Sequence, residues 1–155
     1  MTSNGWNSTD FLELYAIMEK KIKHYNVVCA VVINDGEVLC MQKGQTKYDY
    51  TSFHWEFPGG KIEVGETADQ ALARELREEM DYEVEVGQLL TTVAHYYPDF
   101  SITMQAFLCT THTRKFVMKE HNAAEWLKPD RLMDLTWCDA DRPIAAELMK
   151  KFKTF

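Results

Sequence analysis

The stretch from Gly60 to Tyr82 decides the fold, and it reads GKIEVGETADQALARELREEMDY. From Thr67 onward it consists mostly of good helix formers. Apolar side chains recur there at intervals of three and four residues, at Ala68, Ala71, Leu72, Leu76 and Met80. A stripe with this spacing covers one face of a helix. The stretch therefore predicts one amphipathic helix of about 14 residues that begins near Thr67.

Three glutamates, Glu75, Glu78 and Glu79, fall on one face of that helix. Their i, i+3 and i+4 spacing places the carboxylates within one turn, where like charges repel each other. Arg74 offsets part of this repulsion, and a bound cation would offset the rest. Hard oxygen ligands of this kind suit Mg²⁺ or Mn²⁺. The alternative is a solvated charged face, and the residues just before the helix favour the metal site.

A buried hairpin is expected before the helix. The segment Val27–Ile33 is β-branched and almost entirely apolar, which is typical of a strand buried on both faces. The turn-forming triplet Asn34-Asp35-Gly36 follows, and Glu37–Gln42 returns to strand-like composition. The chain then predicts a loop from Gly44 to Ser52.

Strands and a second helix are also expected after the central helix. Strand-like segments lie at Val84–Val86, Leu89–His95 and Ile102–Cys109. The segment Asp139–Phe152 has helical periodicity, with Pro143 in its first turn. The predicted fold class is therefore α/β, with a mixed β-sheet sandwiched between α-helices.

Composition limits the kinds of partner. The 155 residues include 24 Asp and Glu against 17 Lys and Arg, a formal net charge of −7. This charge repels polyanions and argues against duplex nucleic acid or an anionic membrane as the main partner. A small anionic substrate can still bind if divalent cations first occupy the carboxylates. The length and the 46% hydrophobic content predict a single domain with a packed core.

Nothing in the sequence resembles a membrane span or a secretory signal. The longest apolar run, Val27–Ile33, is far shorter than the roughly 20 residues that cross a bilayer. We therefore expect a soluble, cytoplasmic protein. The cysteines have spacings that fit neither a zinc site nor a disulfide scaffold, so we expect buried reduced thiols at Cys29, Cys40, Cys109 and Cys138.

The first 17 residues differ from the rest of the chain. A polar tract rich in Ser, Asn and Gly, Thr2–Thr9, precedes a short apolar patch from Phe11 to Ile17. Met18, which is followed by a basic segment, could serve as a natural start. We expect residues 1–17 to be an extension, either a vector remnant or a mis-annotated start, and residues 18–155 to form the domain. The alternative is a genuine N-terminal helix.

The stretch Gly60–Tyr82 resembles the Nudix box, the signature of the Nudix hydrolases. Its Gly, the Glu at position 66, the Arg-Glu pair at Arg74 and the later Glu-Glu pair all match, so every charged position of the pattern is present. The clear departure is Asp81, which replaces a Gly just past the helix. That position commonly needs a left-handed backbone, which Asp adopts at a cost of about 1 kcal/mol. Tyr82 replaces an aliphatic residue, which is a packing change.

The resemblance implies a Nudix fold over roughly residues 26–152 and a metal site within it. Glu75 and Glu79 would bind the metal, and Glu78 would bind it or order a water. The backbone carbonyl of Gly59 would add a ligand. Glu120 matches the position from which MutT-like members supply an extra carboxylate, and the alternative is an exposed loop residue. The expected cofactor is Mg²⁺, with Mn²⁺ as a second possibility.

The resemblance also implies residues that support the chemistry. Glu66 and Arg74 would form an ion pair that holds the loop against the helix and orients Glu75. The candidate catalytic set is therefore Glu66, Arg74, Glu75 and Glu78. Lys61, which directly follows two glycines, and Lys43 are candidate phosphate contacts, with solvated surface lysines as the alternative.

The segment before the box narrows the expected reaction. Residues Trp55–Glu63, WEFPGGKIE, resemble the MutT-type branch, which cleaves nucleoside triphosphates. By this resemblance, water would attack the β-phosphorus and release nucleoside monophosphate and pyrophosphate. Which glutamate acts as base varies within the family, and Glu78 is the candidate here. The expected partner is a small nucleotide, and the expected state is a monomer or a homodimer.

The base pocket is expected near the C-terminal helix. In MutT-like members a residue before this helix reads the base edge, and Asp141 occupies that place here. An ionised carboxylate only accepts hydrogen bonds, so it would suit the exocyclic amino group of cytosine. The pattern also resembles the CTP pyrophosphohydrolase branch. The equal alternative is that Asp141 caps the helix. Three aromatic residues could stack on the base or belong to the core: Tyr97, Phe57 and Phe100.

Two other functions remain compatible with the motif. A hydrolase of nucleotide sugars or dinucleoside polyphosphates would share the box and differ only in its pocket. A catalytically silent domain that binds a nucleotide is the other alternative. Degenerate binders usually lose a metal ligand, and every glutamate of the box is present here, which favours an active enzyme.

Overall fold

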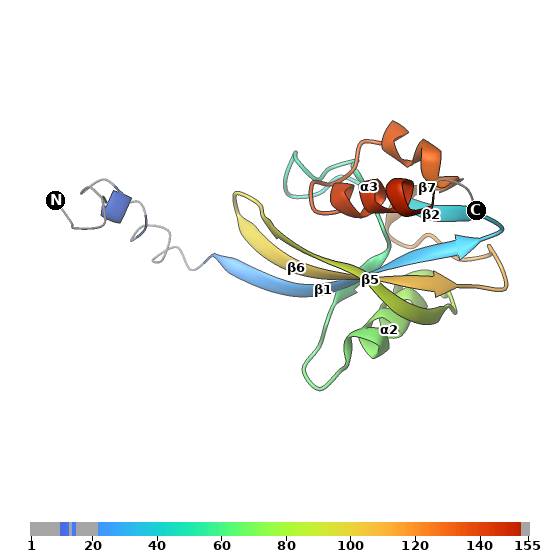
Figure 1. Ribbon diagram of the computed structural model, residues 1–155. Coiled ribbons are helices and arrows are strands. Elements are labelled where there is room, and N and C mark those ends of the chain that lie inside the picture. The colour runs from blue at the N-terminus through green and yellow to red at the C-terminus, as the bar shows by residue number, and fades with distance from the viewer. Residues whose placement is uncertain (1–9, 13, 15–21, 153–155) are drawn as a thin grey trace.

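The computed structural model describes residues 10–12, 14 and 22–152. Most of the predicted extension, residues 1–17, lies outside the described residues, and its role stays a prediction. Within the described part, one central sheet has α2 (Ala68–Met80) on one side and α3 (Arg142–Lys151) with the 3₁₀ helix η1 (Pro129–Asp134) on the other (Figure 1). The predicted α/β class with a mixed sheet between helices is confirmed.

Within residues 22–152 the sheet contains seven strands. Their bounds are β1 Lys23–Asn34, β2 Glu37–Lys43, β3 Trp55–Glu56, β4 Gly59–Lys61, β5 Glu85–Tyr96, β6 Phe100–Thr110 and β7 His121–Leu127. The main path runs β3-β2-β1-β6-β5, while β4 pairs with β1 and β7 pairs with β2. The long β1–β6 pair is parallel and the other pairs are antiparallel, which makes the sheet mixed.

Strand β1 is the centre of the sheet. One edge pairs with β6 along its whole length, and the other edge pairs first with β4 and then with β2. The predicted strand, turn and strand are confirmed: Asn34 pairs with Glu37 across Asp35 and Gly36. Both turn residues have positive φ, 50° and 74°, which suits a two-residue hairpin.

The core lies on both faces of β1, because successive side chains of a strand point to opposite sides. Val28, Ala30 and Val32 pack with the apolar stripe of α2. Cys29 and Val31 pack on the other face, in the cluster that includes residues of η1 and α3. All four cysteines are buried and free, as predicted.

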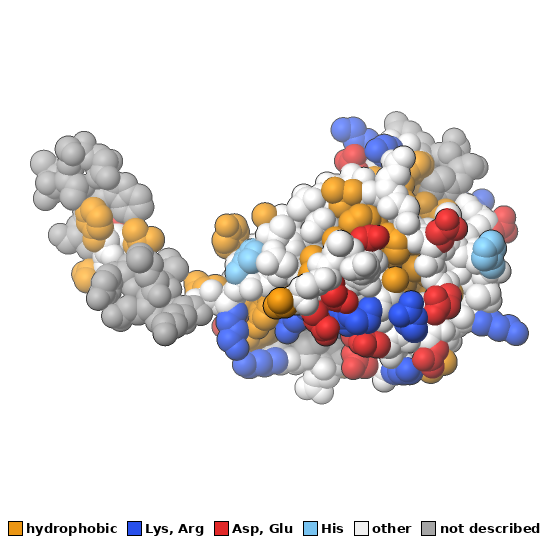
Figure 2. Space-filling model, turned by 90° about the horizontal axis from the view of Figure 1, so that it is seen from below, with side chains coloured by type: hydrophobic (Ala, Val, Ile, Leu, Met, Phe, Trp, Pro, Cys, Tyr) orange, Lys and Arg blue, Asp and Glu red, His pale blue; other side chains and the backbone are white. Residues whose placement is uncertain are grey.

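Helix α2 forms as the sequence predicts. Thr67 caps it, with its side chain accepting from the backbone N–H of Gln70, and the Gln70 side chain accepts from the backbone N–H of Thr67 in return. The helix ends at Asp81, which takes the left-handed conformation with φ 47° and ψ 41°. Seen from the α2 side, acidic and basic side chains lie intermixed on the surface (Figure 2).

Several elements differ from the sequence-based expectation. Helix α3 begins at Arg142 rather than at Asp139, and Pro143 lies in its first turn as predicted. The short strands β3 and β4, the strand β7 and the 3₁₀ helix η1 had no prediction, because their segments are too brief or too irregular in pattern. No helix among the described residues is long and apolar enough to cross a membrane.

The packing of β4 against β1 yields a stability prediction. Gly59 pairs with Cys29, and a Cβ on Gly59 would overlap the backbone carbonyl oxygen of Val28. We expect Gly59→Ala to lower the free energy of unfolding by about 2 kcal/mol, because backbone must move. Thermal unfolding should show a melting temperature lower by about 5 °C. Gly44→Ala is the control, because a Cβ there meets nothing closer than 3.9 Å, and an equal loss in both variants would contradict the prediction.

Candidate active site

A cleft of about 1170 Å³ runs along the end of the sheet. Its walls come from the start of β1, the loop after β2, the segment around β3 and β4, and the β5–β6 hairpin tip. Glu79 and Glu120 lie in its lining, and so do Lys43, Lys61 and Asp141. The fold therefore brings residues from distant parts of the sequence to one cleft that joins a carboxylate region to a region rich in aromatic side chains.

The carboxylate region is crowded. Burial, followed by the charges of Glu75 and Glu120, raises the pKa of Glu79 to about 7. These causes place the three carboxylates within electrostatic reach of one another, although the helix supplies two of them and the segment before β7 supplies the third. Arg74 balances part of this negative charge through its ion pair with Glu75. The carboxylate oxygens that remain are ligands that suit a divalent cation.

Two glycines shape this region. A Cβ on Gly60 would overlap the carboxyl group of Glu75, so the glycine gives that carboxylate room beside β4. Gly59 has no space for a Cβ either, and it lies in the lining of the cleft. Among the described residues, no three His, Cys, Asp or Glu side chains already surround one point. Holding an ion with three of these side chains would therefore require some of them to rotate.

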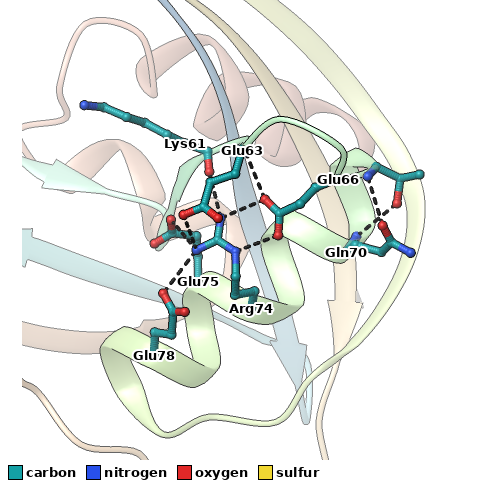
Figure 3. A network of polar contacts seen from close by, with 8 residues as sticks. Lys61, Glu63, Glu66, Gln70, Arg74, Glu75 and Glu78 are labelled. Atoms are coloured by element: carbon teal, nitrogen blue, oxygen red, sulfur yellow. Dashed lines mark hydrogen bonds and ion pairs between the residues drawn. The ribbon is translucent and has the colours of Figure 1, made fainter.

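Arg74 is the centre of the polar network beside the carboxylates (Figure 3). Its guanidinium contacts both carboxylate oxygens of Glu66, at 2.6 and 2.9 Å, and donates to the Lys61 carbonyl oxygen at 3.0 Å. It also donates to Glu75 and Glu78, each at 3.1 Å. Hydrogen bonding to Glu66 is the main reason that the pKa of Arg74 is raised and that the pKa of Glu66 is lowered.

The network fastens the loop before α2 to the helix. Glu66 accepts from the backbone N–H of Glu63 at 2.9 Å, so one carboxylate closes the loop and binds the arginine. The side chain of Arg74 is only 17% exposed, whereas that of Glu78 is 62% exposed. The structure therefore brings Glu66, Arg74 and Glu75 together as predicted, and it places Glu78 at the solvent side of the same network.

A second polar group lies deeper in the cleft. Glu56 contacts the Nζ atom of Lys43 at 3.3 Å and the Nε2 atom of His121 at 3.0 Å. Burial acts to raise the pKa of Glu56, but His121 and Lys43 outweigh it and hold the pKa below its usual value. The charge of Glu56 likewise overcomes burial and keeps the pKa of Lys43 raised. Lys43 therefore stays a cation inside the cleft.

The structure contradicts one of the two sequence-based alternatives for Asp141, that its side chain caps the C-terminal helix. It occupies the N-cap position of α3, but its side chain makes no capping hydrogen bond. Its Oδ1 atom instead accepts from the backbone N–H of Phe57 at 3.0 Å, and the residue is 6% exposed. Burial and then the charge of Glu56 raise the pKa of Asp141 well above its usual value. The helix-cap alternative is therefore wrong, and the role of Asp141 in reading a base edge stays a prediction.

The predicted aromatic residues take different places. Tyr97 and Phe100 lie in the cleft lining, with ring centroids 4.8 Å apart. Tyr48 and Tyr50, from the loop after β2, stack alongside them. Phe57 also lies in the lining, but it is 2% exposed and its ring stacks on Trp137 at 4.6 Å, so its side chain is packed in the core. Its backbone N–H is the part that meets Asp141.

The two lysines that were predicted to contact phosphate lie in different parts of the cleft. Lys43 lines the cleft, where it pairs with Glu56 at 3.3 Å and lies within the electrostatic reach of Asp141. Lys61 lies at the exposed rim, with its Nζ atom 4.3 Å from the centre of the Tyr25 ring. Sequence analysis missed Glu56 and His121 as members of the site. Both could have been found from their neighbours in the sequence, since Glu56 falls within the WEFPGG segment and His121 follows Glu120.

Comparisons with known proteins agree with this geometry. The family model described as NUDIX domain matches residues 23–152. An 8-oxo-dGTP diphosphatase of Proteus vulgaris is 38% identical over 104 residues, which cover 67% of this chain and 90% of that protein. A CTP pyrophosphohydrolase of Escherichia coli is 32% identical over 140 residues, which cover 83% of this chain and 93% of the relative.

A solved structure of a Nudix hydrolase is also similar to this chain. The solution structure of the DNA mismatch repair protein MutT, a Nudix hydrolase of methicillin-resistant Staphylococcus aureus, matches with a TM-score of 0.66 and 35% identity. The match covers 84% of this chain and 98% of that chain.

The crowding around Glu79 predicts how stability depends on pH without metal. The folded state raises the pKa of Glu79 to about 7, so it retains a proton that the unfolded state releases. Stability should therefore fall as pH rises from about 4.5 to 7. Glu79→Gln removes this loss. At pH 8 its free energy of unfolding should exceed that of the wild type by about 1 kcal/mol after solvent screening, and at pH 4 the two should be equal.

Urea unfolding in the presence of a chelator measures this difference. Glu83→Gln is the control, because that side chain is 76% exposed. A Glu79→Gln variant that is less stable than the wild type at pH 8 would show that the carboxylates do not repel one another.

Proposed function

Because the chain belongs to the Nudix family, we propose that it is an acid-anhydride hydrolase that cleaves (deoxy)nucleoside triphosphates to nucleoside monophosphate and pyrophosphate. The observation that carries the proposal is the cleft itself. It joins a crowded set of carboxylates, Glu75, Glu79 and Glu120, to a buried polar end at Asp141. A triphosphate and a base have the matching chemistry at the two ends.

The chain's donor set fits a divalent cation, Mg²⁺ with Mn²⁺ as an alternative. The carboxylates of Glu75, Glu79 and Glu120 and the carbonyl of Gly59 would hold it, and Glu78 would bind it or order a water. When bound, the ion supplies positive charge to the phosphate oxygens. The proximity of Glu75 and Glu120 to Glu79 supports this assignment.

The protein's own residues would do the rest of the chemistry. Glu78 leaves its ion pair with Arg74 and takes a proton from the attacking water. The water oxygen bonds to the β-phosphorus, and the bond from that phosphorus to the α–β bridging oxygen breaks. Arg74, anchored by Glu66, keeps Glu75 oriented. Lys43 balances phosphate charge inside the cleft, and Lys61 does so at the rim.

The base would bind at the end of the cleft that contains Asp141. Its buried carboxyl group, bonded to the Phe57 N–H, offers hydrogen bonds to a base edge. Tyr97 and Phe100 supply an aromatic wall beside it. The two relatives are named for an oxidised guanine nucleotide and for CTP. We propose a cytosine-type or oxidised nucleotide as the substrate, because the carboxyl group of Asp141 can accept a hydrogen bond from an exocyclic amino group of the base.

Loss of one carboxylate tests the reaction. We expect Glu79→Gln to fold normally and to lose turnover by a factor of about 10³ or more, because a principal electrostatic element is removed. Pyrophosphate release measured at saturating Mg²⁺, across canonical and oxidised nucleoside triphosphates, checks this. ADP-ribose and a dinucleoside tetraphosphate belong in the same screen. A variant that keeps more than a tenth of wild-type turnover would refute the metal role of Glu79.

Replacing one carboxyl oxygen of Asp141 by an amide nitrogen tests the base pocket. We expect Asp141→Asn to keep the Phe57 contact, since the amide oxygen can still accept, and to change the ranking of nucleotides. Cytosine triphosphates should lose about 1 to 3 kcal/mol in kcat/KM relative to the others, because the amide offers donors where the carboxylate offered only acceptors. The measurement compares CTP, dCTP, dGTP and 8-oxo-dGTP on the two proteins. An unchanged ranking would remove Asp141 from the base pocket.

A further inference from the structure

The connection between β6 and β7 is fastened to the C-terminal end of α2. Carbonyl groups in the last turn of a helix have no donor within the helix. Here the backbone N–H of Val117 donates to the Met80 carbonyl oxygen at 2.8 Å. The Nζ atom of Lys119 donates to the Glu78 carbonyl oxygen at 2.9 Å. The connection thus supplies donors that the helix lacks.

Asp81 adds an anionic contact at the same place. Its Oδ1 atom accepts from the Nζ atom of Lys119 at 3.0 Å. The residue is left-handed, φ 47°, a conformation that glycine adopts more easily. A glycine here would relieve the backbone but could not bind Lys119. The departure from the glycine of the Nudix pattern therefore has a structural partner, and that partner directly precedes Glu120.

Other contacts hold the rest of the connection. The hydroxyl of Tyr82 donates to the Thr113 carbonyl oxygen at 2.6 Å, and its ring packs 5.2 Å from that of Phe116. On the far side of Glu120, His121 begins β7 and pairs with Lys43 of β2. Glu120 is thus the one residue between an anchored strand and the lysine bound to α2. Both Glu120 and Glu79 lie in the lining of the cleft.

We propose that Asp81 and Lys119 are positioning residues, whose ion pair holds Glu120 beside the carboxylates of α2 so that helix and connection bind one divalent cation together. This inference rests on the proposed function. Neither residue lies in the lining of the cleft, so their role in ion binding is indirect, through the placement of Glu120. Their ion pair connects the end of the helix that carries Glu79 to the segment that carries Glu120.

Binding of Mn²⁺ to the nucleotide-free protein tests the proposal without turnover. The free ion is followed by electron paramagnetic resonance in titrations of the wild type, Asp81→Gly and Lys119→Met. We expect each variant to raise the Mn²⁺ dissociation constant about three- to tenfold. The melting temperature of metal-free Asp81→Gly should hold or rise, since glycine suits the left-handed position. Lys119→Arg, which keeps the charge, should retain most of the affinity.

A second background separates this role from a general effect on the helix. In Glu120→Gln protein, which lacks the positioned carboxylate, adding Lys119→Met should weaken Mn²⁺ binding no further. Glu83→Gln is the matched control, because it breaks an exposed ion pair with Arg77 at the same end of α2. That control should leave Mn²⁺ affinity unchanged.

The outcomes distinguish this proposal from the proposed function. Unchanged Mn²⁺ affinity in Asp81→Gly and Lys119→Met, with a wild type that binds the ion, would overturn the positioning role alone. The same loss from Lys119→Met with and without Glu120 would also overturn it, because the effect would not pass through that carboxylate. A wild type that does not bind Mn²⁺ would overturn both.

Discussion

The guanidinium of Arg74 is the contact on which the candidate site depends. It bonds Glu66 with two nitrogens, the carbonyl of Lys61 with one, and Glu75 and Glu78 with another. Without it, these carboxylates would repel one another across the loop and the first turns of α2. Because the side chain is largely shielded from water, its bonds are less screened than those of an exposed pair. The arginine therefore stabilises the loop and presets Glu75.

The buried strand β1 connects this network to the rest of the molecule through packing. Its alternating side chains pack α2 on one face and the cluster with α3 on the other. Its pairing with β4 fixes Gly59 and Gly60 beside it, and the missing Cβ atoms let backbone and carboxylate approach closely. Helix α2, which carries Glu75 and Glu79, and the α3 side, which contains Asp141, therefore pack on opposite faces of one strand.

Buried polar groups connect the two ends of the cleft. Glu56 joins Lys43 to His121, and Asp141 lies close enough for the charge of Glu56 to raise its pKa. Low exposure makes each of these charges matter more than it would in water. Lys43, His121 and Asp141 are therefore electrostatically linked through Glu56.

The sequence alone determined the parts that depend on nearby residues. Helix α2, its start near Thr67 and the shared face of its glutamates follow from side-chain spacing, which fixes neighbours within a helix. Only the tertiary structure decided that Asp141 bonds the backbone of Phe57, which lies 84 residues away, and that His121 meets Glu56 across 65 residues. Such contacts form when strands pair and water is excluded. Strands as short as β3 and β4 have no periodic pattern from which their position could be predicted.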